Sequence, residues 1–145
     1  MINFIENSQV SILDFAFQAS GGDGEVSIDE INALEQNKKK LIHIFNKLGI
    51  ISGLNEQNAK AEKELVNEYL SLISNKEIKF SLENFSIAAD RITAISLQPL
   101  TLAFAIKVAG SDGLHEGELK LIDKQKEEWS CEEEDIKYYF DELDG

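Results

Sequence analysis

Apolar residues along the chain recur at helical spacing. The first clear segment, about Ser8 to Ser20, places Val10, Leu13 and Phe17 on one face. No run shows the period-2 alternation of a half-buried strand, so the pattern predicts an all-α protein. Further helices are expected at about 27–48, 58–74, from 81, 99–110, 116–129 and from 130 onward.

Capping residues mark several of the expected helix ends. Ser27 and Glu30 fit a capping box, and Gly49 is the expected stop of that helix. The sequence also allows a break near Asn37, because the lysines that follow it interrupt the apolar face. Pro99 suits the first position of a helix. A second capping box is expected over residues 130–133, opening a last helix with Ile136, Tyr139, Phe140 and Leu143 on one face.

The segment from Pro99 to Gly110 is apolar on nearly all sides. A helix of this kind is buried at the centre of a domain, because it has no polar face to turn towards water. It is too short to cross a bilayer, which requires about 20 apolar residues. The sequence therefore predicts a central core helix and no membrane span.

A weak internal repeat joins the first segment to this central helix. Residues 13–17 align with residues 102–106, and the same offset of 89 pairs Asp23-Gly24 with Asp112-Gly113. In each copy an apolar helix runs into an Asp-Gly turn and then into an acidic helix start, one residue sooner in the second copy. We therefore expect one domain over 1–145, with repeat units at about 8–49 and 97–143 around a pseudo-twofold axis.

Charge narrows the range of partners. The 145 residues hold 14 Lys and Arg against 27 Asp and Glu, a net charge of −13. Hydrophobic residues make up 43% of the chain, which excludes a disordered acidic tail. The surplus of carboxylates argues against nucleic acid and anionic lipid, both of which require clustered Lys and Arg. The expected charged partners are metal cations or a basic surface on another protein.

The single cysteine, Cys131, cannot form an internal disulfide. Together with the absence of a secretory signal at the N-terminus, this favours the reducing cytoplasm. Flanking glutamates oppose activation of the thiol, so no redox role is expected.

The repeated Asp-Gly turns, together with residues 129–133 before the last helix, resemble the TerB tellurite-resistance family over about Ile12 to Leu143. The resemblance implies a compact bundle of about seven helices, with a metal-binding acidic face built from both turns, in a stress-linked or tellurite-resistance assembly. The implied metal ligands are Asp23, Glu30, Asp112 and Glu118, with Asp29 and Glu116 as outer helpers. Gly21-Gly22 and the shortened second copy depart from the usual pattern of the family.

The residues themselves allow two interpretations of these turns. Asp23, Gly24 and Glu30 match positions five, six and twelve of a calcium-binding loop, but Ala19 and Gly21 stand where further oxygen ligands belong. A complete calcium loop is therefore not expected, and Glu30 could simply close its capping box. A weak site for Ca²⁺, Mg²⁺ or Mn²⁺ suits an all-oxygen ligand set.

No catalytic motif stands out. We expect His43 and His115 to be ordinary surface or edge histidines, Trp129 to be a packing anchor, and Lys38-Lys39-Lys40 to be solvated. The chain is expected to be a non-enzymatic, divalent-cation-binding or cation-responsive module. The alternative is a metal-independent interaction scaffold that uses its acidic face.

Overall fold

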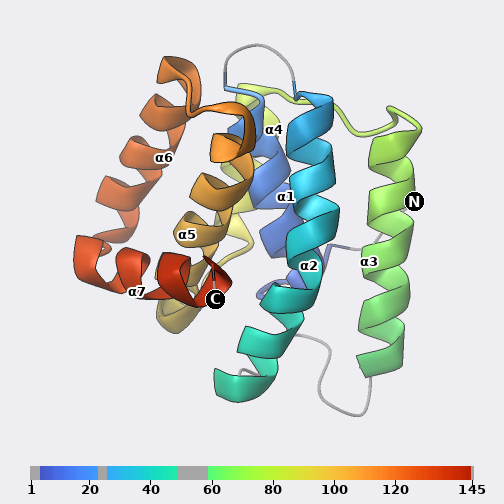
Figure 1. The fold of residues 1–145 in the computed structure, drawn as a ribbon, viewed down its shortest axis with the longest axis horizontal. Coiled ribbons are helices and arrows are strands. Elements are labelled where there is room, and N and C mark those ends of the chain that lie inside the picture. The colour runs from blue at the N-terminus through green and yellow to red at the C-terminus, as the bar shows by residue number, and fades with distance from the viewer. Residues whose placement is uncertain (1–3, 23–25, 49–58, 145) are drawn as a thin grey trace.

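The computed structural model describes residues 4–22, 26–48 and 59–144, and over these ranges the chain is helical with no β-strand (Figure 1). This confirms the all-α fold class. Seven α-helices and two 3₁₀ helices are present in the described part: α1 (Gln9–Ser20), α2 (Ile28–Leu48), α3 (Ala59–Ser74), α4 (Leu82–Asp90), η2 (Ile95–Leu97), α5 (Gln98–Ala109), η3 (Gly110–Asp112), α6 (Glu116–Trp129) and α7 (Glu133–Asp144).

Serine side chains start two of the helices where the sequence predicts them. The Ser8 hydroxyl accepts from the Ser11 N–H at 3.2 Å at the start of α1, and the Ser81 hydroxyl accepts from the Asn84 N–H at 2.9 Å at the start of α4. Each bond satisfies one of the amide groups that a helix leaves without an internal partner at its first turn. Pro99 lies in the first turn of α5, where its missing N–H costs nothing.

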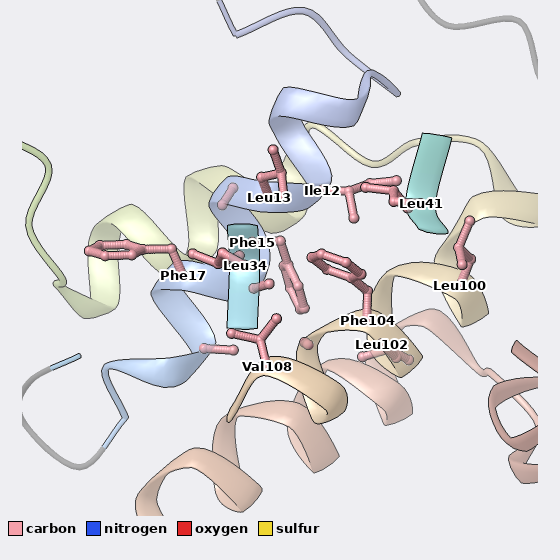
Figure 2. Close-up of a cluster of buried hydrophobic side chains, with 14 of the residues drawn as sticks. Ile12, Leu13, Phe15, Phe17, Leu34, Leu41, Leu100, Leu102, Phe104 and Val108 are labelled. Carbon is pink, nitrogen blue, oxygen red and sulfur yellow. The ribbon is translucent and has the colours of Figure 1, made fainter. Parts of the chain in front are cut away.

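Helices α1 and α5 lie side by side at the centre of the bundle (Figure 1). Every residue of α1 is buried, and on α5 Phe104 is fully enclosed. Figure 2 shows Phe104 next to Phe15 of α1, with Leu34 of α2 close by. The expectation that the apolar segment near residues 99–110 forms a central core helix is confirmed. The pseudo-twofold relation between the repeat units stays a prediction.

Helix α2 continues past Asn37 without the break that the sequence allows there. The Asn37 side-chain amide donates to the Ala33 carbonyl at 2.8 Å and is buried, so the polar residue is satisfied within the helix. The expected stop at Gly49 lies outside the described residues. No helix of the described residues is long and apolar enough to cross a membrane.

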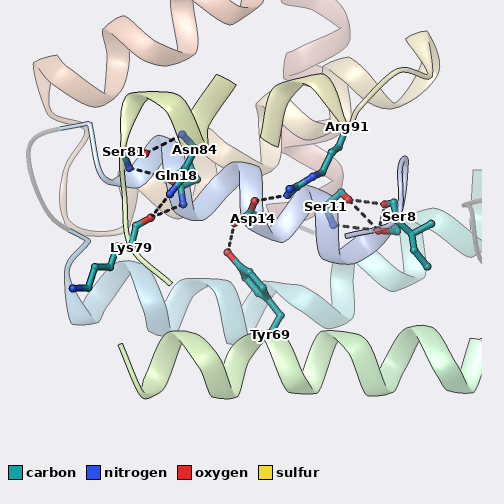
Figure 3. Close-up of polar contacts among 10 residues, drawn as sticks. Ser8, Ser11, Asp14, Gln18, Tyr69, Lys79, Ser81, Asn84 and Arg91 are labelled. Carbon is teal, nitrogen blue, oxygen red and sulfur yellow. Dashed lines mark hydrogen bonds and ion pairs between the residues drawn. The ribbon is translucent and has the colours of Figure 1, made fainter. Parts of the chain in front are cut away.

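A buried polar cluster ties α1 to the helices around it. Asp14 of α1 accepts from the Tyr69 hydroxyl of α3 at 2.7 Å and from the Arg91 guanidinium, after α4, at 3.1 Å (Figure 3). The Arg91 guanidinium also lies 4.1 Å from the centre of the Phe4 ring. Three segments distant in sequence therefore meet at one carboxylate.

The surroundings of Asp14 pull its pKa in opposite directions. Burial raises the pKa of Asp14, while the hydrogen bond from Tyr69 and the charge of Arg91 lower it in part. The pKa of Tyr69 is raised well above its usual value by burial and by the neighbouring carboxylate. Tyr69 therefore remains a hydrogen-bond donor across the physiological pH range.

Replacing Tyr69 with Phe should lower the free energy of unfolding by about 1–3 kcal/mol, because it leaves a buried carboxylate oxygen without its donor. Urea denaturation measures this change. Tyr138→Phe is the matched control, because Tyr138 is 52% exposed, and it should change stability by less than about 0.5 kcal/mol. Equal effects of the two substitutions would contradict the role given to the buried hydroxyl.

The raised pKa of Asp14 predicts a pH dependence of stability. A carboxyl group that binds its proton more tightly when folded stabilises the native state at low pH and loses that contribution as the pH rises through its folded pKa. The stability of the wild type minus that of Asp14→Asn should therefore fall as the pH rises from about 4 towards neutrality. Denaturation curves across that range give the slope. A difference that grows with pH would show that the Arg91 charge outweighs burial.

Candidate functional site

The start of α2 is built as the sequence predicts. The Ser27 N–H donates to Glu30 Oε1 at 2.8 Å, and the Glu30 N–H donates to the Ser27 hydroxyl at 3.1 Å. Glu30 is only 1% exposed. The capping interpretation of Glu30 is thus confirmed, and its carboxylate lies inside the protein at the first turn of the helix.

A second capping carboxylate stands at the start of α6, where the sequence analysis did not expect one. The His115 N–H donates to Glu118 Oε1 at 2.9 Å, and His115 Nδ1 lies 3.1 Å from the same oxygen. Glu118 is fully buried, whereas the His115 side chain is half exposed. Glu118 follows Glu30 by 88 residues, and His115 follows Ser27 by the same offset. The sequence does carry a signal for this second cap. Because the second copy is one residue shorter, Glu118 follows His115 at the same spacing at which Glu30 follows Ser27.

The capping box expected over residues 130–133 is wrong. Ser130 has a left-handed backbone, with φ of 53°, and it ends α6 by donating its N–H to the last turn of that helix. Helix α7 begins only at Glu133, whose carboxylate accepts from Lys126 Nζ at 2.9 Å. A serine that terminates one helix is therefore not in place to cap the next.

Four helix termini gather at one end of the bundle. The ends of α1 and α5 and the starts of α2 and α6 all lie at the top of Figure 1. Gly22 packs so closely on α6 that a Cβ atom there would lie 2.6 Å from the Gly117 carbonyl oxygen and 2.8 Å from Glu118 Cα. Gly22 thus allows the end of α1 to approach the start of α6 closely.

Of the four expected ligands, the structure describes the side chains of Glu30 and Glu118. Asp23 lies outside the described residues, and Asp112 ends η3 without a described side chain. Helix α2 contacts η3, which places Asp112 near the same end of the bundle. In the portion of the chain that is described, no group of three or more His, Cys, Asp or Glu side chains could hold a metal ion.

The expected outer helpers are turned towards solvent. Asp29 is exposed. Glu116, on the first turn of α6, forms an ion pair with Lys120, whose Nζ lies 3.3 Å from Glu116 Oε1. Exposed ion pairs of this spacing contribute a few tenths of a kcal/mol to a helix. Neither residue shares the burial of Glu30 and Glu118.

Glu118 carries one polar atom that the capping box does not use. Its Oε2 is buried, and no hydrogen-bond donor from the described residues reaches it. Buried carboxylate oxygens are normally satisfied by donors, water or a cation, because leaving one bare costs a large desolvation free energy. As a buried carboxylate oxygen, Glu118 Oε2 is a suitable ligand for a hard cation.

The remaining candidates have ordinary surroundings. His43 is exposed, and Trp129 is partly buried with its ring 5.4 Å from that of Phe15, which confirms the packing anchor. Burial raises the pKa of the Cys131 thiol, and the charge of Asp135 raises it further. A thiol of this kind is a poor nucleophile. Lys39 is exposed, while Lys38 and Lys40 are partly buried.

Comparison with known proteins adds no relative to this picture. No family model, curated protein or solved structure matches the chain.

The close contact at Gly22 predicts that substitution by alanine affects stability very differently at Gly22 and at Gly110. Gly22→Ala should destabilise the protein by about 1–3 kcal/mol, because the new methyl group meets backbone atoms that cannot move aside. Gly110 follows α5 at the corresponding turn and has open space at its Cβ position. Gly110→Ala should therefore be neutral, or stabilising by up to about 1 kcal/mol. Urea denaturation of both variants tests the contact, and an equal loss in the two would refute it.

Proposed function

We propose that the protein is a non-enzymatic, TerB-like helical module that binds a divalent cation at the end of the bundle where α1 and α5 end and α2 and α6 begin. The observation that carries the proposal is the buried Oε2 of Glu118, to which no described residue donates a hydrogen bond. A bound cation would offset the cost of that burial.

The packing of the turns supports a shared site. Gly22, directly before Asp23, lies against the backbone of Gly117 and Glu118. Asp112 ends the 3₁₀ helix that α2 contacts. The buried Glu30 and Glu118, at the starts of α2 and α6, lie at the same end of the molecule, and Asp23 and Asp112 are the ligands we propose to complete the set.

The ligand chemistry selects the class of ion. Carboxylate oxygens favour Ca²⁺, Mg²⁺ or Mn²⁺ over softer metals. Because Glu30 and Glu118 each use Oε1 to cap a helix, few protein oxygens remain for the ion. We therefore propose a weak site in which water completes the coordination shell. A cation-responsive domain of this kind would serve a stress-linked or tellurite-resistance assembly.

The alternative is a metal-independent interaction scaffold. Its support is the exposed acidic surface of α7, on which Glu134, Asp135 and Asp141 face solvent. In that case the two buried glutamates would serve only to start α2 and α6.

Thermal melting with each of the three ions, against a chelator, tests the cation site. An ion at about 100 times its dissociation constant stabilises a protein by about 2.7 kcal/mol, which should raise the melting temperature by about 5–10 °C. The double variant Asp23→Asn with Asp112→Asn should abolish the rise. Isothermal titration should show heat for the wild type only.

A matched control removes the same charge elsewhere. Glu128 and Asp141 are exposed on α6 and α7, so Glu128→Gln with Asp141→Asn should keep the full response to the ion. If both double variants lose the response equally, the ion acts only on the net charge of −13. If the wild type shows neither a shift nor heat, the interaction scaffold is the better account.

A further inference from the structure

We infer that a groove at the opposite end of the bundle binds a segment of a partner protein in which arginine stands next to apolar side chains. The groove has a volume of about 460 Å³ and lies between η2 with the start of α5 and the junction of α6 with α7. These segments lie at the lower end of Figure 1, away from the starts of α2 and α6. The inference is independent of the proposed cation site.

The groove exposes apolar surface that the fold leaves uncovered. Ile95 is 82% exposed and Tyr138 is 52% exposed, and both line the groove. Trp129, Tyr139 and Pro99 form partly buried parts of its wall. Aromatic side chains of this kind are enriched where proteins bind one another, because they bury much area while losing little conformational freedom.

The charge of the groove selects the partner. Glu132 and Asp135 line it and are exposed, and none of its described lining residues is Lys, Arg or His. A second copy of this chain is disfavoured as the occupant, because each copy carries a net charge of −13. The complementary occupant is a cationic segment with an apolar side chain to place on Ile95 and Tyr138.

Arginine suits this combination better than lysine does. Its planar guanidinium can stack on an aromatic ring while it donates two hydrogen bonds to a carboxylate. The protein already combines a ring and a carboxylate around an arginine internally, where the Arg91 guanidinium lies 4.1 Å from the centre of the Phe4 ring and donates one hydrogen bond to Asp14 at 3.1 Å. The groove presents the same two chemical groups, an aromatic ring and a carboxylate, to an outside arginine.

The chain contains its own reporters for this site. Its only tryptophan, Trp129, and its only cysteine, Cys131, both line the groove. A ligand seated there should therefore change the intrinsic tryptophan fluorescence and slow the alkylation of Cys131. Cys131 also borders a neighbouring pocket on α6, so only a ligand that changes both signals is assigned to the groove.

The test titrates the full chain with four short synthetic peptides of matched length, built from Arg and Leu, Lys and Leu, Glu and Leu, or Arg and Ser. The Arg-Leu peptide should bind most tightly, change the Trp129 fluorescence and protect Cys131. The Lys-Leu peptide should bind more weakly, and the Glu-Leu and Arg-Ser peptides should lose about ten-fold or more in affinity. Chelator should have no effect, which separates this result from the fate of the cation site.

Variants on the surface of the groove locate the binding. The affinity for the Arg-Leu peptide should fall about ten-fold in the double variant Glu132→Gln with Asp135→Asn. It should fall by a similar factor in the separate variant Ile95→Ser. The matched controls are Glu128→Gln with Glu134→Gln, and Ile87→Ser, because these residues are exposed outside the groove. They should leave affinity unchanged. Circular dichroism and melting confirm that each variant is folded.

Several results would overturn the inference. These are binding of the Glu-Leu peptide as tightly as the Arg-Leu peptide, binding that leaves Trp129 and Cys131 unaffected, and equal losses in the control variants. Sedimentation that shows a dimer of the wild type but a monomer of Ile95→Ser would also overturn it, and would assign the groove to a second copy of the chain.

Discussion

Helix α1 has no face towards solvent, and this constraint explains much of the surrounding structure. A buried helix must find a partner inside the protein for every polar side chain it carries. Asp14 meets Tyr69 and Arg91, and Gln18 bonds to the backbone of Lys79 and Ser81. The polar groups of α1 therefore fix where α3, α4 and the segment between them lie, while the apolar groups set the contact with α5.

Much of the fold could be predicted from local signals. The serines before α1 and α4, the capping box of Ser27 and Glu30, and Pro99 in α5 all act within one helical turn, so a short stretch of sequence reveals them. The error at Ser130 has the same local origin. The four residues from Ser130 to Glu133 fit a capping pattern, but the left-handed end of α6 takes the serine first.

Contacts between distant residues were less open to prediction, both in the buried polar cluster and at the candidate site. In the polar cluster, Tyr69 lies 55 residues from Asp14 and Arg91 lies 77 residues away, so no periodicity in the sequence indicates that they meet. Glu118 was expected as a ligand from the repeat, yet its capping role with His115 was missed because histidine is not a usual capping residue. The role of Gly22 became visible only with α6 packed against it.

The pairing of α1 with α5 also has a consequence for synthesis of the chain. About 90 residues separate the end of α1 from the end of α5, and at about 5–20 residues per second a ribosome needs about 5–20 seconds to make them. During that interval the emerging chain carries an apolar helix without the helix that covers much of it. Until α5 has emerged, α1 is therefore an exposed apolar segment of the kind that chaperones recognise.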